Sequence, residues 1–321
     1  LGYNYQEEAW LDLPKAIEWL EKGMLYCELY SAYELALIYL YNDDYKNVER
    51  GLMCLERCVE GDYIEGIEGL ANVYFNGDLV EEDMSRAKQL LEKALELGSG
   101  NAAYRLGWMY ERGFLSEEPD YVKAMEYYEK AAELDNVDGY CRAALYLANG
   151  YSGVTDAVKS REYYEKAAGM GSCFALVELS FLYENGNGVE RSYEKAFELC
   201  EKAAQEGYPY AMFRVGLYLE KAVLGEAKPE EAFAWYTKAA FHPSFAPAAN
   251  GVTPSRVFNF LTASTNSSYV SGSLAPASSN NVLLQNNVIY HENIGVEYNF
   301  PSYSNADVEP STILDLTSSV K

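Results

Sequence analysis

Histidine is nearly absent from this chain of 321 residues, and its two histidines, His242 and His291, both come after residue 240. The first 240 residues therefore lack the side chain that most often transfers protons near neutral pH, so no histidine-based triad or metal site can be placed there. The glycine-rich stretch 186–188 lacks the Lys-Ser or Lys-Thr pair of a phosphate-binding loop. We therefore expect no enzymatic activity, no cofactor and no metal.

Long hydrophobic runs and basic side chains are scarce as well. No stretch of eighteen apolar residues occurs, so the sequence predicts no membrane insertion. With 25 basic residues against 49 acidic ones the net charge is -24, and such a surface repels nucleic-acid phosphates and anionic lipid headgroups. The partners that this charge favours are basic or neutral proteins or peptides. The acidity can equally serve only to keep the chain in solution.

Charge is also missing from one end of the chain. Of the 49 acidic residues 44 precede residue 241, as do 23 of the 25 basic ones, and Ser, Asn, Thr and Pro dominate residues 241–321. We expect a linker with a short capping helix at 241–262, then a disordered Ser/Asn-rich low-complexity tail at 263–321. Two apolar islands in that tail, 282–284 and 288–290, are either partner-binding motifs or ordinary parts of the disordered tail.

The cysteines show no spacing that recurs along the chain. They are Cys27, Cys54, Cys58, Cys141, Cys173 and Cys200. Cys54 and Cys58 are four residues apart and could share a metal, but no histidine or second cysteine pair lies near them in the sequence. Buried free thiols are the preferred interpretation, and they favour a reducing, cytoplasmic location.

What the sequence has in abundance is an internal repeat of about thirty-six residues. A glutamate followed by a basic residue recurs within an apolar run at Glu21, Glu56, Glu92, Glu129, Glu165 and Glu201, with Thr237 in the last copy. A second column, called the tyrosine column here, lies at Tyr39, Tyr74, Tyr110, Leu147, Tyr183 and Leu219. Both columns have intervals of 35, 36, 37, 36 and 36 residues. Because an insertion shifts both columns together, the shared slips indicate repeating structural units.

Small residues recur at fixed distances from these two columns. They lie three and eight residues before the tyrosine column, as at Gly107 and Ala102, and five residues before the glutamate column, as at Ala124. Side chains of this size let two helix axes approach closely. Apolar residues come after Ala124 at the spacings i+3, i+4, i+7 and i+8, which is the period of a helix and not of a strand.

Start and stop signals divide each repeat into two helices. Side chains that can cap the second helix stand at Asp12, Asn47, Asp83, Asp120, Asp156 and Ser192. Predicted helix stops stand at Gly23, Gly61, Gly98, Gly171 and Gly207. A lone helix pair cannot bury its apolar faces, but stacked pairs can. The sequence therefore predicts an all-α fold, an alpha-alpha superhelix or solenoid of about seven helix pairs over residues 1–240, the first of them partial.

The segments Leu-Gly-Trp-Met-Tyr at 106–110 and Lys-Ala-Met-Glu-Tyr-Tyr-Glu-Lys-Ala-Ala at 123–132 resemble the Sel-one-like repeat family, a relative of the tetratricopeptide repeat. Leu147 and the pair Cys54-Leu55 depart from its aromatic pattern. The resemblance implies an adaptor that assembles protein complexes. A cysteine-rich branch of the family is associated with beta-lactam binding, but its paired cysteines in every repeat are missing here. Since residues 1–5 fit the middle of a repeat, we expect further repeats upstream.

In helix-pair arrays of this kind the first helices line the concave face. Side chains of those helices that point away from the small-residue columns are therefore candidate partner contacts. They are Glu68, Asn72, Phe75, Tyr104, Trp108, Glu111, Phe181, Glu184, Phe213 and Glu220, with Val177 and Leu217 at equivalent positions. Aromatic rings beside amides and carboxylates suit a peptide with apolar and basic side chains. The alternative is that the rings only fill a tightly curved inner surface.

These observations favour a protein-interaction scaffold that binds partner proteins or peptides on its concave face in the cytoplasm. The alternative is a lumenal or exported adaptor, of the kind used in quality control at the endoplasmic reticulum or in host interaction. The sequence names no particular partner for either.

Overall fold

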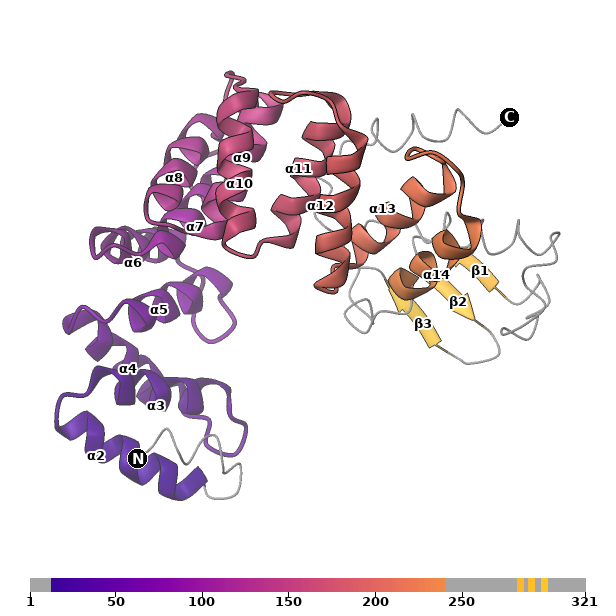
Figure 1. Cartoon of the computed structure of the whole chain (residues 1–321). Helices are drawn as coiled ribbons and strands as arrows, with labels where there is room; N and C mark the ends of the chain where they lie inside the picture. Colours follow the sequence, from indigo (N-terminus) through magenta and orange to yellow (C-terminus); the bar gives the residue numbers. More distant parts are fainter. Residues whose placement is uncertain (1–12, 241–281, 286–287, 292–295, 300–321) are drawn as a thin grey trace. The chain divides into compact units, whose positions relative to one another are not determined.

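The computed structural model describes residues 13–240 and three short segments at 282–285, 288–291 and 296–299. The chain divides into two units, residues 1–170 and 171–321, and each is described by itself. Between residues 13 and 240 all regular structure is helical (Figure 1). The predicted cap at Asp12 and the predicted capping helix within 241–262 lie outside the described residues.

The helices are short and of nearly equal length. The first unit contains α2 (Leu13–Leu25), α3 (Leu29–Tyr41), α4 (Val48–Glu60), α5 (Ile64–Asn76), α6 (Met84–Glu96), α7 (Gly100–Glu111), α8 (Tyr121–Glu133), α9 (Val137–Asn149) and α10 (Ala157–Gly169). The second unit contains α11 (Cys173–Asn185), α12 (Tyr193–Gln205), α13 (Pro209–Glu220) and α14 (Pro229–Ala240). In the described part of the chain no helix is both long enough and apolar enough to cross a membrane.

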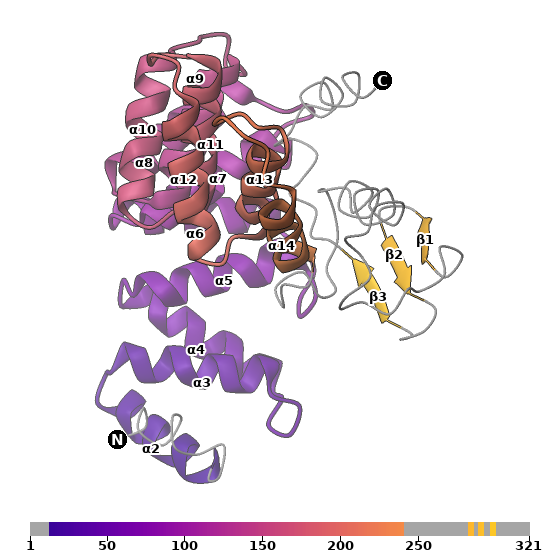
Figure 2. The same cartoon turned by 45° about the vertical axis from the view of Figure 1, so that its right-hand side comes forward.

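The odd-numbered helices from α3 to α13 are the first helices of the repeats, and the even-numbered ones are the second helices. Each first helix packs on the second helix of its own repeat. Within the first unit α2, α4, α6 and α8 also pack on the next first helix along the chain, and within the second unit α12 packs on α13 (Figures 1 and 2). The predicted helix pairs, stacked in sequence order, are therefore confirmed within each unit.

The predicted small-residue columns are buried. Those represented by Gly107 and Gly51 face the other helix of their own pair, whereas Gly66 and Gly139 face the second helix of the preceding repeat. A Cβ atom added to Gly107 would lie 2.8 Å from the ring of Tyr128, and one added to Gly216 would lie 2.5 Å from the ring of Tyr236. Both tyrosines are almost completely buried. The glycines therefore provide the space into which a large ring from the second helix packs. The contact thereby reaches the packing density that is typical of protein interiors.

A backbone hydrogen bond closes the loop inside each repeat. The amide of the residue that caps the second helix donates to the carbonyl of the tyrosine column, as Asp120 does to Tyr110 at 2.9 Å and Asp156 does to Leu147 at 3.0 Å. Leucine can replace tyrosine at Leu147 because this bond uses the carbonyl and not the phenol. The predicted caps that lie within the described residues accept the expected bonds; they are Asn47, Asp83, Asp120, Asp156 and Ser192.

The structure corrects one of the predicted helix stops, because Gly23 lies within α2. Gly61 comes directly after α4, as predicted, but with a negative φ of -94°. The residues that adopt positive φ after the second helices are Cys27, Asp62, Gly98, Asp135, Gly171 and Gly207. Aspartate tolerates this left-handed conformation because its short polar side chain can form local hydrogen bonds. Glycine alone is therefore an incomplete marker of the left-handed positions, although four of the five predicted stops lie within two residues of the end of a second helix.

The C-terminal segment contains three strands that the sequence analysis did not predict. β1 (Val282–Gln285), β2 (Val288–His291) and β3 (Val296–Asn299) form an antiparallel sheet in the order β1-β2-β3. Leu284 pairs with Ile289, and Tyr290 pairs with Glu297. The two apolar islands noted in the sequence fall in β1 and β2, where β-branched and aromatic residues favour extended backbone. The rest of the predicted tail lies outside the described residues.

One residue with positive φ offers a test of the loop geometry. After the first helices the left-handed position is glycine at Gly77, Gly113, Gly150 and Gly186, but it is Ala222 in the last repeat, with φ 55°. An alanine in this conformation costs about 1–2 kcal/mol. We predict that Ala222→Gly raises the free energy of unfolding by about 0.5–1 kcal/mol, once the larger entropy of the unfolded chain is included.

The matched control is Gly186→Ala, which should lower the free energy of unfolding by about 1 kcal/mol for the same reason. Both changes are measured by urea denaturation of the full chain. A fall in stability for Ala222→Gly would show that the backbone at this position is not left-handed.

Candidate partner-binding surface

The ten predicted contact residues lie on four first helices, in two separate units. Helices α5 and α7 of the first unit carry Glu68, Asn72, Phe75, Tyr104, Trp108 and Glu111. Helices α11 and α13 of the second unit carry Phe181, Glu184, Phe213 and Glu220. The two sets are therefore two surfaces, and the side chains within each have different surroundings.

Phe75 and Trp108 lie together at the ends of α5 and α7, and both are half-buried. Their ring centroids are 5.5 Å apart. A third ring, Phe114, comes from the loop after α7 and lies 5.3 Å from each of them. Phe114 remains 41% exposed. Phe75, Trp108 and Phe114, which we call the aromatic cluster, therefore present apolar surface to solvent at the loop end of two adjacent first helices.

Sequence reasoning missed Phe114 because it searched only helical positions. The one available signal was an aromatic residue directly after a glycine, Gly113, which has positive φ and ends the helical turn. Such a glycine turns the chain back across the end of its own helix. The loop side chain is thereby brought over the rings of α5 and α7.

Glu68 is occupied by the next repeat. Its carboxylate accepts hydrogen bonds from the Ser99 hydroxyl and from the Asn101 amide, the latter at 2.6 Å. Ser99 also caps α7, a role that the sequence analysis did not assign. Glu68 thus links α5 to the start of α7, and Asn72, one turn further along α5, is half-buried.

Glu111 is buried, with 8% of its surface exposed, so the predicted exposed contact at this position is wrong. Its carboxylate accepts the hydroxyl proton of Tyr128 and lies 3.8 Å from the guanidinium of Arg142. Burial, and then the charge of Glu111, raise the pKa of Tyr128 well above its usual value. Tyr104 packs against Tyr128 with a centroid distance of 5.8 Å. These side chains fill the interior between α7, α8 and α9.

In the second unit Phe181 and Glu184 surround a buried arginine. Arg214 of α13 is 6% exposed and lies 3.9 Å from the centre of the Phe181 ring. Its guanidinium donates to Glu184 and to the Tyr218 hydroxyl, the latter at 2.8 Å. Tyr218 in turn donates to Glu184 at 3.1 Å. Glu184 and Phe181 therefore hold α11 and α13 together.

Sequence reasoning missed Arg214 because it looked for outward-facing anchors. A pattern was available: arginine stands five residues before the tyrosine column at Arg105, Arg142 and Arg214. Arg142 and Arg214 each pair with the glutamate directly after that column in the preceding repeat. These pairs serve stacking of neighbouring repeats.

The remaining two predicted contacts are also used within the fold. Phe213 is only 7% exposed and packs on Tyr236 at 5.5 Å between centroids, so the predicted contact there is wrong. Glu220 is exposed, yet it accepts the Tyr236 hydroxyl proton at 2.6 Å. Of the ten residues, Phe75 and Trp108 belong to the aromatic cluster and are partly exposed to solvent.

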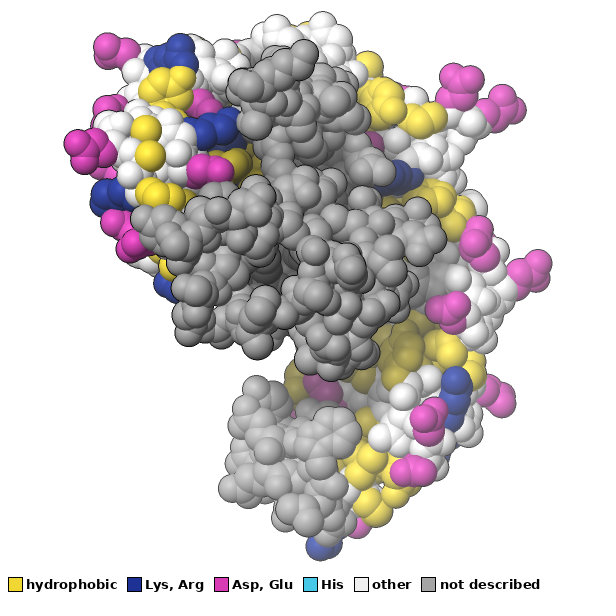
Figure 3. Space-filling model, turned by 90° about the vertical axis from the view of Figure 1, so that its right-hand side faces the viewer, with side chains coloured by type: hydrophobic (Ala, Val, Ile, Leu, Met, Phe, Trp, Pro, Cys, Tyr) yellow, Lys and Arg dark blue, Asp and Glu magenta, His cyan; other side chains and the backbone are white. Residues whose placement is uncertain are grey.

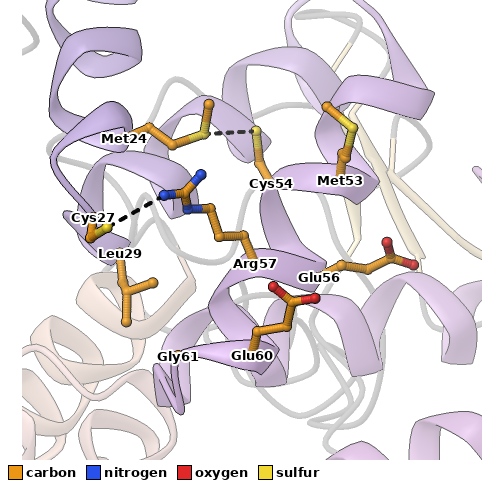
Figure 4. Close-up of a pocket in the computed structure, with 9 residues that line it drawn as sticks. All are labelled: Met24, Cys27, Leu29, Met53, Cys54, Glu56, Arg57, Glu60 and Gly61. Carbon is orange, nitrogen blue, oxygen red and sulfur yellow. Dashed lines mark hydrogen bonds between the residues drawn. The ribbon is translucent and has the colours of Figure 1, made fainter.

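A pocket of about 590 Å³ lies at the N-terminal end of the first unit, between α2, α3 and α4. It is lined by Met24, Cys27, Leu29, Met53, Cys54, Glu56, Arg57, Glu60 and Gly61. Figure 4 shows Arg57 reaching toward Cys27, with its nitrogen 3.7 Å from that sulfur, and Met24 meeting Cys54 at 3.9 Å. The pocket is lined largely by sulfur and apolar groups, and its charged groups lie on one helix.

The thiols are free in all six positions. Burial raises the pKa of Cys54, and it raises the pKa of Cys58 to about 12, so both are protonated at neutral pH and are poor nucleophiles and metal ligands. Cys27, by contrast, is exposed, and the expectation that it would be buried is wrong. Among the described residues no three His, Cys, Asp or Glu side chains are grouped so that they could hold a metal ion.

The buried ion pair between Arg214 and Glu184 allows a direct test of whether Glu184 holds α11 and α13 together. Removal of one partner leaves an uncompensated buried charge, which typically costs about 3–5 kcal/mol. Since 29% of the Glu184 side chain is exposed, we predict that Glu184→Ala lowers the free energy of unfolding by about 3 kcal/mol, the low end of that range.

The control is the exposed pair Lys228–Glu231, whose side chains are 56% and 57% exposed. Glu231→Ala should change the free energy of unfolding by less than about 0.5 kcal/mol. Chemical denaturation of both variants measures the difference. Equal effects would mean that Glu184 is an ordinary surface residue.

Comparison with known proteins places this arrangement in a family. A family model described as "Sel1 repeat" matches residues 1–23, 64–99, 100–136, 137–172, 174–208 and 209–240. The boundaries from residue 64 onward agree with the repeats of the structure. The unmatched stretch 24–63 contains Cys54-Leu55, where the aromatic pattern of the repeat is interrupted.

Two solved structures share the fold. A protective antigen of uropathogenic Escherichia coli, described as having an SLR fold, is 26% identical with a TM-score of 0.65, over 75% of this chain and 52% of the antigen. The chain thus spans about half the length of that antigen. A Sel1 repeat protein from Oxalobacter formigenes is 21% identical with a TM-score of 0.60, over 74% of this chain and 94% of that protein. On the repeat matches, which cover more than half of its residues, the chain belongs to the Sel1 repeat family.

Proposed function

We propose that this protein is a non-catalytic scaffold that binds partner proteins or peptides on the surface formed by its first helices. The observation that carries the proposal is the aromatic cluster, in which Phe75, Trp108 and the exposed Phe114 are held together. Large aromatic side chains that are packed against neighbouring residues often supply much of the binding energy at protein interfaces. Membership of a repeat family used widely for protein interactions supports the same conclusion.

The way the array uses its polar side chains supports a role without catalysis. Glu68, Glu111 and Glu184 each hydrogen-bond to a side chain of the chain itself. A general acid or base has to reach a substrate proton, which carboxylates used in this way cannot do without breaking the stacking. The function that these side chains leave to the surface of the protein is binding of a partner and not proton transfer.

We further propose that the protein works in the cytoplasm and not in an oxidising compartment. All six cysteines are free, and one of them, Cys27, is exposed. Oxidising compartments favour disulfides, whereas reducing ones keep exposed thiols free. The lumenal or exported alternative has no comparable support.

The test begins with affinity capture on the full chain, identification of captured proteins by mass spectrometry, and purification of each candidate. Binding is then measured by calorimetry for the wild type, for Trp108→Ala and for Trp19→Ala. Trp19 is a matched control because it is 39% exposed but lies on α2, away from the aromatic cluster. We predict that Trp108→Ala weakens binding at least tenfold and that Trp19→Ala changes it less than twofold.

The proposal fails if no captured protein binds saturably once it is purified. The proposal that the partner binds at the first helices fails if Trp108→Ala keeps its helices by circular dichroism and binds the partner as tightly as the wild type does.

A further inference from the structure

The surface around the aromatic cluster is apolar at its centre. Leu79 and Val80, in the loop after α5, and Leu115, next to Phe114, are partly buried and pack on the same core as Phe75 and Trp108. Phe114 packs on Phe75 and Trp108, with its ring edge-on to Phe75 at an interplanar angle of 88°. Such contacts fix the rings in place, so that a partner would not have to order them.

The rim of this surface is acidic. The loop after α5 contributes Asp78, Glu81 and Glu82, and the loop after α7 contributes Glu117 and Glu118. All five side chains are exposed. None of them forms an ion pair with another described residue, unlike the carboxylates of the stacking contacts. Figure 3 shows a face of the molecule on which acidic side chains project beside hydrophobic ones.

Positive charge near the rim is limited. The two loops contain one basic side chain, the exposed Arg112, and a second exposed cation, Arg86, follows at the start of α6 with a hydrogen bond to Gln89 at 3.4 Å. Lys123 lies over the Tyr110 ring at 5.2 Å and pairs with Asp120 at 3.4 Å. Lys88 pairs with Glu92 at 3.5 Å. The two loops that flank the aromatic cluster in the sequence therefore carry an excess of negative charge without ion pairs among the described residues.

We infer that the aromatic cluster and its acidic rim dock a peptide segment in which one large apolar side chain is flanked by lysine or arginine. The inference rests on the proposed scaffold function and names its partner. The apolar side chain packs against Phe114 and Trp108, where water is displaced from both surfaces. The flanking cations face the carboxylates of the two loops, which increases the association rate and excludes acidic competitors.

Other occupants fit these features less well. A nucleic acid would place phosphates against five carboxylates, which is repulsive despite the rings. A second copy of the same surface would bring two acidic rims together, which is also unfavourable. A segment with one large apolar side chain between basic residues can pack on the aromatic cluster and pair with the carboxylates of the two loops at the same time.

The experiment is a selection from a random dodecamer peptide library displayed on phage, with the full chain immobilised. Enriched peptides are synthesised, and their affinities for the wild type are measured by fluorescence polarisation at low and high salt. We predict that they carry an aromatic or long aliphatic residue between basic ones. Replacing that residue with alanine should weaken binding at least tenfold, and raising the salt concentration should weaken it further.

Variants of the chain locate the site. Phe114→Ala should weaken binding at least tenfold, whereas Tyr121→Ala, which removes a ring of similar exposure, 45%, from α8, should have less than a twofold effect. The double variant Glu117→Gln with Glu118→Gln should weaken binding and reduce its salt dependence. The control is Glu126→Gln with Glu133→Gln, two exposed acidic residues of α8.

The inference is overturned if no peptide is enriched, if enriched peptides lack basic residues, or if Phe114→Ala binds them as tightly as the wild type. These outcomes are distinct from failure of the scaffold function. Captured proteins could bind saturably and lose affinity with Trp108→Ala, yet be insensitive to salt and to the loop carboxylates. That result would support the scaffold function and contradict only the basic character of the partner.

Discussion

The close approach of the two helices in each repeat is the constraint on which the rest of this structure depends. Columns of glycine, alanine and serine leave room at the contact, and a large side chain of the second helix fills it. In the third and sixth complete repeats that side chain is a tyrosine, Tyr128 or Tyr236, whose ring would collide with any Cβ atom at Gly107 or Gly216. Neighbouring repeats then cover the remaining apolar faces, because no single pair can do so alone.

Packing of this kind determines what the polar side chains can do. A buried tyrosine hydroxyl needs an acceptor, and the first helix supplies one: Glu111 for Tyr128 and Glu220 for Tyr236. Arginines of the next repeat use the same positions, as Arg214 does with Glu184. These charges on the first helices therefore hold neighbouring helices together. The partner surface that we propose lies where loops bring apolar rings, and carboxylates that form no ion pair with another described residue, to the ends of the helices.

The repeating features of the fold could be predicted from the sequence, and the features that occur once could not. The period, the helix pairs and the caps recur in several copies, so each copy supports the others. Phe114 has an aromatic counterpart in one other repeat, Tyr151 after Gly150, and so does not form a column along the chain. The residues with positive φ at Asp62 and Asp135 are not glycines, so no glycine marks these positions in the sequence. Helical spacing places Glu111 and Phe213 on an outward row, but it does not show that a neighbouring helix covers that row. The strands from Val282 to Asn299 lie in a segment whose composition predicted no regular structure.

The most direct measurement is the difference in unfolding free energy between Gly107→Ala and Gly69→Ala. Both glycines lie inside first helices, where alanine is intrinsically favoured by about 1 kcal/mol. At Gly69 the nearest side-chain atoms lie 3.4 Å from an added Cβ, so we predict a gain in stability. At Gly107 the fully buried Tyr128 ring lies at 2.8 Å, so we predict a net loss of about 1–2 kcal/mol. A gain in stability at both positions would contradict the dependence of the fold on this close approach of the helices.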